Sequence, residues 1–480
     1  MSDRDAPDRG LLSVGAYAPS ERVPAEAFAE AWGRFKSGGI EEKAVAAPDE
    51  DAVTMAYEAG RRALAAAGVD GAALDRLAFA TTTPPTAEED PTVQLREMFG
   101  APEDAAVGLY TGSTRAGTRA LLEAIHDAAA DGPALVVVAD RPRGEPESAI
   151  EHAAGAGAAA FVVVGSPAAV VRDSARTSEL YRGTRFRRTG EDAVESLGIT
   201  SYEREAFTGT VAAAVDGVDV DLDAVDAAAV QAPNGRLPYR AGKRLGLEAE
   251  TLSRCLPVHD LGDLGAASVP VGLARALADA TTVLAASFGS GAGADALVVE
   301  ATGDVPVRAD LDGEASLSYA EYLQRRGELT SGAPSGGGAY VSVPAWKRTT
   351  AQRYRLVAGE CPECESLNFP PSGACSTCHE RVSYESVELE ETGTVEATTV
   401  ISQGGAPPEF AEQQAQSGDF AVVLVALDGP DGRTASVPAQ VVDADPDAVA
   451  VGDRVETTIR RVYTQEGVTR YGFKVRPATE

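Results

Sequence analysis

The chain has 480 residues, 44% of them hydrophobic, which suits two or three folded domains rather than a single core. It carries 73 acidic residues against 42 lysines and arginines, a formal charge of −31. This charge excludes binding to nucleic acid or to an anionic membrane surface, because both need a basic face, and no apolar stretch approaches the ~20 residues of a membrane span.

The basic residues are almost all arginines, since the lysines are only Lys36, Lys43, Lys243, Lys347 and Lys474. Few lysines, many acids and abundant alanine and glycine are typical of a salt-adapted, haloarchaeal protein. An ordinary acidic protein is the alternative, although so large a charge destabilises a compact state in dilute buffer. Residues 1–10 are charged and lack the apolar run of a signal peptide, so we expect a cytoplasmic protein.

The N-terminal part alternates short apolar strands with alanine-rich helices. A first round is predicted from residues 10–20 (strand and turn), 51–67 (helix), 74–83 (helix end and strand), 118–130 (helix), 134–140 (strand) and 155–165 (strand). A second round is predicted from residues 226–231 (strand), 240–247 (helix), 268–278 (helix) and 281–301 (paired strands). Two rounds of strands and helices predict an α/β layered fold of two similar halves, over residues 10–165 and 166–300.

The pattern fades over residues 301–345, where the run SGAPSGGGAY (331–340) has the composition of a flexible connector. A ribbon segment follows at 346–385. Over residues 386–480, strand-like runs separated by Gly, Asp and Pro turns predict a small all-β barrel of about five strands.

Four of the 5 cysteines form two CxxC pairs, Cys361–Cys364 and Cys375–Cys378. Each pair presents two thiolates on a tight turn, and the two pairs together supply the tetrahedral ligand set of zinc. Four thiolates leave no open position for water, so we predict a structural zinc ion rather than a catalytic one. His379, directly after the second pair, is an alternative ligand.

Trp346, Tyr354 and the run GECPECESLNFPPSGACSTC (359–378) resemble the DUF35 family of acyl-CoA-associated proteins, in which a zinc ribbon precedes an OB-fold barrel. The resemblance extends from Pro344 to the C-terminus. It implies docking to a thiolase-type subunit and shielding of a CoA thioester. Nucleic-acid binding, the role of many OB folds, is excluded because this barrel is acidic and poor in aromatic residues.

Six motifs in order resemble archaeal hydroxymethylglutaryl-CoA synthases, which have the thiolase fold. They lie at residues 42–60, 116–121, 155–161, 232–238, 261–268 and 288–297. The family resemblance implies a cysteine nucleophile, a histidine before the PNG motif and a glutamate as general acid/base. This sequence has Thr114 (or Ser113, if the register shifts by one), Gln231 and Thr82 (or Thr83) at those positions, so all three roles are vacant.

The remaining acidic, cysteine and histidine residues are poor substitutes for these three roles. The acidic run Glu88–Asp90 is typical of a solvated loop, and Cys255 with His259 is more typical of a packed core than of a nucleophile and its base. His126 and His152 fit ordinary helix or strand-edge positions.

Thioester binding is a separate question from catalysis. By the resemblance, the residues after the PNG motif would contact the phosphates of CoA; they are Asn234, Arg236, Arg240 and Lys243. The glycines of GSGAGAD (289–295) would let backbone amides approach a carbonyl oxygen. The alternative is that all of these residues only maintain packing.

Two hypotheses follow. In the first, the chain is a non-catalytic acyl-CoA-binding or scaffold subunit that joins a catalytic thiolase through its barrel. In the second, it is a working acyltransferase or C–C condensing or cleaving enzyme of the synthase type, with an atypical site. The thiolase fold implies a homodimer or a larger assembly with a thiolase.

Overall fold

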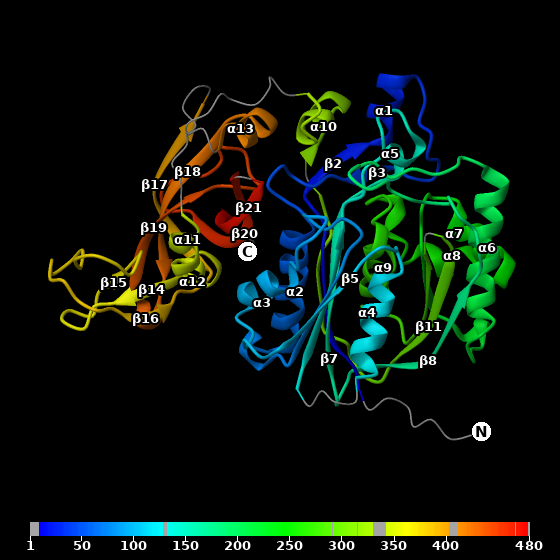
Figure 1. The fold of residues 1–480 in the computed structure, drawn as a ribbon, viewed down its shortest axis with the longest axis horizontal. Helices are drawn as coiled ribbons and strands as arrows, with labels where there is room; N and C mark the ends of the chain where they lie inside the picture. Colours follow the sequence, from blue (N-terminus) through cyan, green and yellow to red (C-terminus); the bar gives the residue numbers. More distant parts are fainter. Residues whose placement is uncertain are drawn as a thin grey trace. The chain divides into compact units, whose positions relative to one another are not determined.

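The computed structural model describes residues 9–127, 132–289, 291–313, 315–329, 342–402, 410–465 and 467–478. They form two compact units (Figure 1). Unit 1 comprises Met1–Ala46 and Asp51–Tyr322, and unit 2 comprises Ala47–Glu50 and Leu323–Glu480. The predicted connector at 331–340 lies outside the described residues.

Unit 1 is built on a ten-stranded sheet with the order β5-β4-β6-β7-β1-β8-β11-β10-β9, and β12 pairs with β1. The strands are β1 Gly10–Tyr17, β4 Arg76–Ala80, β5 Ala106–Tyr110, β6 Ala134–Asp140, β7 Gly157–Val164, β8 Ala169–Ser178, β9 Ala227–Val230, β10 Thr282–Gly289, β11 Gly293–Ala301 and β12 Val307–Asp310. β4 pairs in parallel with both β5 and β6, and β9 pairs in parallel with β10, while β6, β7, β1, β8, β11 and β10 pair in antiparallel succession. The predicted two-round α/β fold is confirmed.

Helices cover the sheet in layers. The larger ones are α2 Ala52–Ala67, α3 Thr92–Phe99, α4 Ala116–Ile125, α6 Thr200–Val215, α7 Leu237–Leu245 and α9 Ser268–Ala276. Figure 1 shows α4 and α9 between strands of the first half (β5, β7) and of the second half (β8, β11). Accordingly, the central hydrophobic core joins α4 and α9 to both halves, whereas α6 packs with alternate residues of β9, β10 and β11 in a second core.

Local sequence explains how α2 begins and packs. Asp51 accepts hydrogen bonds from the amides of Val53 and Thr54, and the Thr54 hydroxyl accepts one from the Asp51 amide, so the pair forms a capping box. A Cβ at Gly60 would lie 2.3 Å from the ring of Phe99, so the glycine allows α2 to pack closely against this ring.

Two predicted helices differ at their ends. The helix expected at 118–130 begins at Ala116 and ends at Ile125, and residues 128–131 lie outside the described part of the chain. The helix expected at 240–247 is α7, which begins earlier, at Leu237, because Pro238 is tolerated in a first helical turn. It ends before Gly246, which is left-handed.

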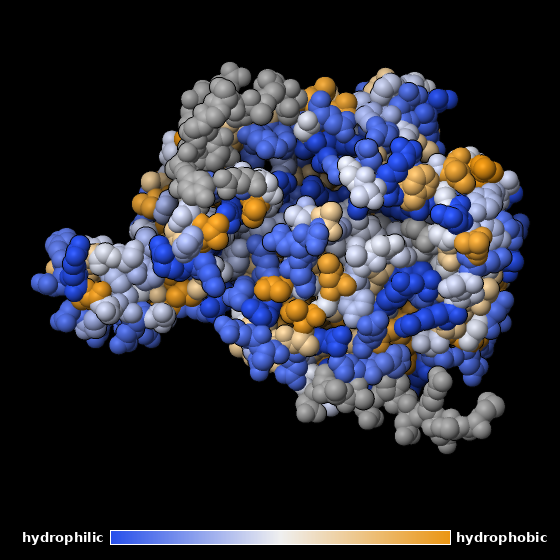
Figure 2. Space-filling view, in the orientation of Figure 1, coloured by the Kyte–Doolittle hydropathy of each residue, from blue (hydrophilic) through white to orange (hydrophobic). Residues whose placement is uncertain are grey.

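The shorter elements are β2 Glu21–Pro24, α1 Ala25–Trp32, β3 Glu42–Ala44, α5 Ala149–Ala153, α8 Ala249–Ser253, β13 Ala315–Ser316, α10 Tyr319–Arg325, α11 Val343–Arg348, α12 Thr350–Arg355 and α13 Ala411–Ser417. Within the described ranges, no helix combines the length and apolar character that crossing a bilayer requires. On the face seen in Figure 2, hydrophilic residues predominate and hydrophobic ones are scattered.

Unit 2 contains a ribbon and a barrel. The ribbon strands are β14 Val357–Glu360, β15 Leu367–Asn368 and β16 Glu385–Glu388. The barrel strands are β17 Thr392–Ile401, β18 Phe420–Asp428, β19 Thr434–Gln440, β20 Arg454–Gln465 and β21 Val468–Pro477, all antiparallel in the order β19-β18-β17-β20-β21. A bridge between Val441 and Val475 nearly closes this sheet. The predicted five-stranded barrel is confirmed.

The segment Ala47–Glu50, which connects β3 to α2 along the chain, belongs to unit 2. Lys474 donates to Asp49 at 2.8 Å, and Arg460 pairs with Glu50 at 3.3 Å. Burial opposes ionisation of Asp49, but the charges of Lys474 and Arg460 outweigh it and lower the pKa of that carboxyl. Separating Asp49 from Lys474, or Glu50 from Arg460, would leave a buried charge without its counter-charge, which is strongly unfavourable. These two ion pairs therefore hold the segment Ala47–Glu50 in unit 2.

Candidate functional site

A cavity of about 350 Å³ lies in unit 1, where residues that follow β9 meet the end of β10 and the residues that precede α4. We call it the β9/β10 cavity. Its lining includes Lys36, Ser37, Thr114, Arg185, Glu203, Arg204, Phe207, Gln231, Asn234, Arg236, Arg240, Asp263 and Phe288. The ends of strands next to helix N-termini are the usual place for ligands in α/β folds.

Thr114 lies two residues before α4 and is 4% exposed. Its hydroxyl donates a hydrogen bond to the carbonyl of Phe288 at 2.6 Å, so only its lone pairs remain available. Ser113 accepts instead from the Arg115 amide at 3.3 Å and is not part of the cavity lining. Of the two nucleophile positions considered, the cavity therefore contains Thr114. Among the described residues that line it, none is a cysteine or a histidine.

Gln231 follows β9 directly and is 2% exposed. Its backbone amide donates to the Ala286 carbonyl of β10 at 2.8 Å, which fixes the residue beside Phe288. Its Nε2 donates to the carbonyl of Gly265 at 2.8 Å. Its Oε1 is buried and accepts no hydrogen bond from any described residue.

Thr82 is not part of the cavity lining. Its hydroxyl donates to Asp140 at 2.7 Å, and the Thr83 hydroxyl donates to the same carboxylate at 2.9 Å. Asp140 is fully buried at the end of β6 and also accepts from the Ala266 amide. The threonine run thus provides hydrogen bonds to a buried carboxylate. Sequence reasoning missed this pairing, although an acid as the last residue of a buried strand was its signal. Thr82 also lines a second hollow with Arg141, Arg143, Arg187 and Arg188.

Of the four residues expected to contact the phosphates of CoA, three line the cavity and one does not. Asn234, Arg236 and Arg240 line the cavity, whereas Lys243, on the same helix α7, is exposed outside it. Asn234 also has a local role, because its Oδ1 accepts from the amides of Arg236 and Leu237 at the start of α7.

Arg185 and Asp263 form an ion pair in the cavity wall that sequence reasoning missed. They lie 78 positions apart, and no local pattern signals their pairing. Asp263 also accepts from the Gly265 amide at 3.0 Å. The Nη2 of Arg185 is buried and has no acceptor among the described residues.

The glycines that were expected to let backbone amides approach a carbonyl oxygen, Gly289 and Gly293, instead lie against the buried ion pair of Arg115 and Asp295. A Cβ at Gly289 would lie 2.4 Å from Cδ of Arg115, and one at Gly293 would lie 2.0 Å from its Nη1. Arg115 donates to Asp295 at 3.0 Å. Residue 290 lies outside the described residues.

The other candidates lie outside the cavity lining. Burial raises the pKa of the Cys255 thiol to about 12, so the thiolate needed of a nucleophile is disfavoured. His259 contacts the Gly39 carbonyl and the Tyr239 hydroxyl. Glu88, Glu89 and Asp90 are exposed, and Asp90 accepts from the Thr92 amide at the start of α3. His126 contacts its own helix through the Leu122 carbonyl.

His152 occupies an aromatic pocket beside the cavity-lining residues Ala149 and Ala153 of α5. It stacks on Phe35, and its Nδ1 accepts from the Lys36 amide at 2.9 Å. Burial and the nearby lysine charges lower its pKa to about 4, so the ring is neutral at physiological pH.

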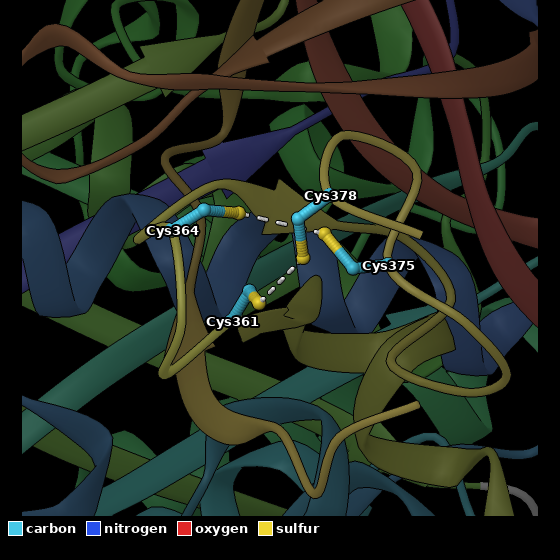
Figure 3. Close-up of side chains that lie close together, drawn as sticks. All are labelled: Cys361, Cys364, Cys375 and Cys378. Carbon is cyan, nitrogen blue, oxygen red and sulfur yellow. Dashed lines mark hydrogen bonds between the residues drawn. The ribbon is translucent and has the colours of Figure 1, made fainter. Parts of the chain in front are cut away.

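The four ribbon cysteines converge on one point (Figure 3). Their sulfur atoms lie within 4.8 Å of one another, and the Cys361–Cys378 and Cys364–Cys375 separations are both 3.7 Å. Tetrahedral zinc with Zn–S bonds of ~2.3 Å places its sulfur ligands about 3.8 Å apart, so this donor set fits zinc.

The two CxxC turns have matching backbones. Glu365 and His379, each directly after the second cysteine of a pair, are left-handed, with φ of 60° and 62°. His379 is exposed and is not part of the cysteine cluster. Hydrogen bonds from Ser366 and from nearby backbone amides lower the pKa of Cys375 to about 5, whereas a backbone hydrogen bond with Glu380 is outweighed by desolvation and the neighbouring cysteines, which raise the pKa of Cys378 to about 12.

Comparison with known proteins gives separate matches for the two parts. The model of the rubredoxin-like zinc ribbon domain of ChsH2 matches residues 348–385, and that of the ChsH2 C-terminal OB-fold domain matches residues 386–460. The hydroxymethylglutaryl-CoA synthase of Methanothermobacter thermautotrophicus is 30% identical over 344 residues, which cover 67% of this chain and 99% of that protein. The Archaeoglobus fulgidus synthase is 29% identical over 351 residues, with coverages of 67% and 99%.

Solved structures agree on the fold. HMG-CoA synthase complexed with CoA superposes with a TM-score of 0.61 at 18% identity, covering 70% of this chain and 94% of that one. The 3-oxoacyl-[acyl-carrier-protein] synthase III of Aquifex aeolicus gives a TM-score of 0.53 at 17% identity, with coverages of 61% and 99%. The predicted thiolase-like fold is therefore confirmed.

Proposed function

Because the chain belongs over two thirds of its length to the hydroxymethylglutaryl-CoA synthase family, we propose that it binds an acyl-CoA thioester in the β9/β10 cavity without acting as a synthase. In this proposal it is a binding or scaffold subunit that works with a catalytic thiolase.

The charge of the cavity supports a CoA ligand. In a chain with a formal charge of −31, basic side chains nevertheless outnumber acidic ones in the lining; the basic ones are Lys36, Arg185, Arg204, Arg236 and Arg240, and the acidic ones are Glu203 and Asp263. Arg236 and Arg240 are exposed, so they are accessible to phosphates, and a guanidinium binds phosphate oxygens in pairs. The solved synthase complexed with CoA has the same fold, which is consistent with this site.

The observation that carries the non-catalytic role is the hydrogen bond from the Thr114 hydroxyl to the Phe288 carbonyl. A hydroxyl nucleophile needs a base to accept its proton, and here the proton points to a carbonyl oxygen that cannot remove it. Gln231, at the position where the family has histidine, has no titratable group. Thr82, at the position where the family has glutamate, carries no carboxylate; its hydroxyl donates to Asp140, and it is not part of the cavity lining.

One observation favours the alternative of an active acyltransferase or C–C condensing or cleaving enzyme with an atypical site. Thr114 lies at the N-terminal end of α4, where the helix dipole stabilises developing negative charge. An acyl group found on Thr114 would support this alternative.

Titration calorimetry with CoA and acetyl-CoA in 2 M KCl tests the binding proposal. We expect Arg236→Met and Arg240→Met each to weaken binding about fivefold to tenfold, because a hydrogen bond made by an exposed side chain contributes about 1 kcal/mol net. Lys243→Met removes a charge from the same helix but outside the cavity, and it should change the affinity less than twofold. Absence of CoA binding to the wild type would overturn the proposal.

The zinc ribbon and barrel are proposed to dock a thiolase, and unit 1 is proposed to form a homodimer. The edge strand β5 supports the second point, because its residues are exposed or half-buried whereas β9 at the other edge is fully buried. An exposed sheet edge offers unpaired backbone groups to a second copy. Light scattering in 2 M KCl, with and without a thiolase that has an intact cysteine, measures both associations. A strictly monomeric protein in both samples would contradict this part of the proposal.

A further inference from the structure

A second hollow in unit 1 lies at the carboxyl ends of three parallel strands. β4 pairs in parallel with β5 and with β6, so Ala80 lies beside Tyr110 where β4 and β5 end. The loops that follow the three strands contribute residues 82–87, 111–112 and 141–143 to a hollow of about 640 Å³. Its described lining shares no residue with that of the β9/β10 cavity. This volume suits a small molecule, and the carboxyl ends of parallel strands are the usual place for ligands in α/β folds.

The lining of this hollow is rich in arginine, and we call it the arginine hollow. Its four arginines are Arg141, Arg143, Arg187 and Arg188. The acids among its described lining residues are Glu191 and Asp192, so basic side chains outnumber acidic ones although the whole chain has a formal charge of −31. The buried Asp140 is not part of the lining, and it already accepts hydrogen bonds from the threonine run and from the Ala266 amide. The hollow is therefore a locally basic site in an acidic protein.

Backbone hydrogen bonds bring the arginines together. Two of them follow Phe186 in a short hairpin, which is closed by reciprocal backbone bonds of 2.9 and 2.8 Å between Phe186 and Glu195. The second arm of the hairpin is bound to the loop after β6, because the Val194 amide donates to the Arg143 carbonyl at 2.7 Å. The fold thus holds the arginine pair of the hairpin near the arginine pair that follows β6.

Arg187 has donors available for a ligand. Its Nη2 donates to the Thr82 carbonyl at 2.6 Å, so its guanidinium group lies at the loop after β4. The side chain is exposed and forms no ion pair with any described residue. A guanidinium group has five N–H donors, and one bond to a carbonyl leaves the others for an anion. Arg188 differs, because it pairs with Glu195 at 2.7 Å.

The number and type of these groups indicate the ligand. A guanidinium group binds phosphate oxygens in pairs, and a phosphate group carries up to about two negative charges, whereas a carboxylate carries one. We propose that the arginine hollow binds a small ligand with two adjacent phosphate groups. This site is separate from the proposed CoA site, and the proposal does not depend on CoA binding.

Titration calorimetry with inorganic diphosphate in 2 M KCl, with and without excess CoA, tests the proposal. The wild type should bind diphosphate at a site from which CoA does not displace it. Arg143→Met and Arg187→Met should each weaken this binding about fivefold to tenfold, because one side-chain hydrogen bond contributes about 1 kcal/mol net. Arg182→Met is the matched control: it removes an exposed arginine from the same segment but outside the lining, and it should change the affinity less than twofold.

Malonate, which carries two carboxylates on a similarly small frame, tests the type of anion. It should bind at least fivefold more weakly than diphosphate, because its charge is lower. Equal or tighter binding of malonate would overturn the assignment to phosphate.

The other outcomes are equally decisive. Absence of diphosphate binding, its displacement by CoA, or unchanged affinity in Arg187→Met would overturn the proposal. Because Arg187 is exposed, this variant decides the question even if Arg143→Met does not fold. If light scattering shows that Arg187→Met changes the association state, the arginines contact another protein chain and the proposal is wrong. Failure of CoA to bind would refute only the proposed function.

Discussion

His152 shows how one residue links the stability of unit 1 to pH. Its pKa is lowered to about 4 from an ordinary value of 6.5, so the unfolded chain binds a proton between these values that the folded chain does not bind. Stability is therefore complete above pH 6.5 and falls as the pH falls toward 4. From pH 7.5 to pH 5 the loss is about 2 kcal/mol for this residue.

Denaturant unfolding in 2 M KCl at pH 7.5 and pH 5 measures this effect. His152→Gln keeps an acceptor for the Lys36 amide but cannot gain a proton, so its loss of stability should be smaller than that of the wild type by about 2 kcal/mol. Equal losses in the two proteins would contradict the buried, neutral histidine.

At the same scale, the sequence predicts part of the candidate site. Motif order along the chain predicts the positions of Thr114 and Gln231, and the structure brings both into one cavity. The sequence does not predict a role for Arg185, because Asp263, the partner that orients this side chain, is 78 positions away and comes close to it only in the folded chain. The orientation of the Gln231 amide is likewise invisible in the sequence, since it depends on the Gly265 carbonyl.

At the scale of elements, the ribbon is the part whose folding depends most directly on a ligand. Its strands β14, β15 and β16 are short, and the cysteine cluster joins the two turns that they carry. Structural zinc supplies on the order of 10 kcal/mol of binding free energy at such sites, so the ribbon should unfold without it.

Metal analysis and thermal melting of single variants test this. Cys361→Ser should lose bound zinc and lower the melting temperature of unit 2, as should treatment of the wild type with a chelator. His379→Gly is the matched control: it removes the alternative ligand at a left-handed residue that suits glycine, and it should keep the zinc. Unchanged melting of Cys361→Ser would disprove a structural metal, and zinc loss in His379→Gly would make the histidine a ligand.

At the scale of the whole molecule, the surface charge predicts dependence on salt. Two of the few lysines, Lys43 and Lys474, are buried at 1% and 2% exposure, so almost all basic groups on the surface are arginines among many carboxylates. Carboxylates in such excess repel one another at low ionic strength. The melting temperature should rise between 0.2 and 3 M KCl by about 5–10 °C, equivalent to a few kcal/mol. A melting temperature that does not change with salt would favour an ordinary acidic protein.

The sequence predicts the architecture well where periodicity decides it. Apolar runs such as β6 and β7 are buried strands, and the strand-like runs after residue 386 form the barrel. It does not predict that Ala47–Glu50 belongs to unit 2, because Asp49 and its partner Lys474 are separated by 425 positions and neither lies in a distinctive pattern. Pairings between residues so far apart in the sequence form only when the chain has folded.

The central claim is that the β9/β10 cavity positions a thioester beside a residue that cannot attack it. The most direct test is intact-mass analysis after incubation with acetyl-CoA in concentrated KCl, for the wild type, Thr114→Cys and Ser113→Cys. A cysteine at position 114 would line the cavity at the N-terminal end of α4, where the helix dipole favours the thiolate, whereas position 113 lies outside the lining.

The account predicts an acetyl adduct on Thr114→Cys and none on the wild type or on Ser113→Cys. An adduct on the wild type would show an active enzyme with an atypical nucleophile. Absence of an adduct on a folded Thr114→Cys protein would show that the cavity does not place a thioester at this residue.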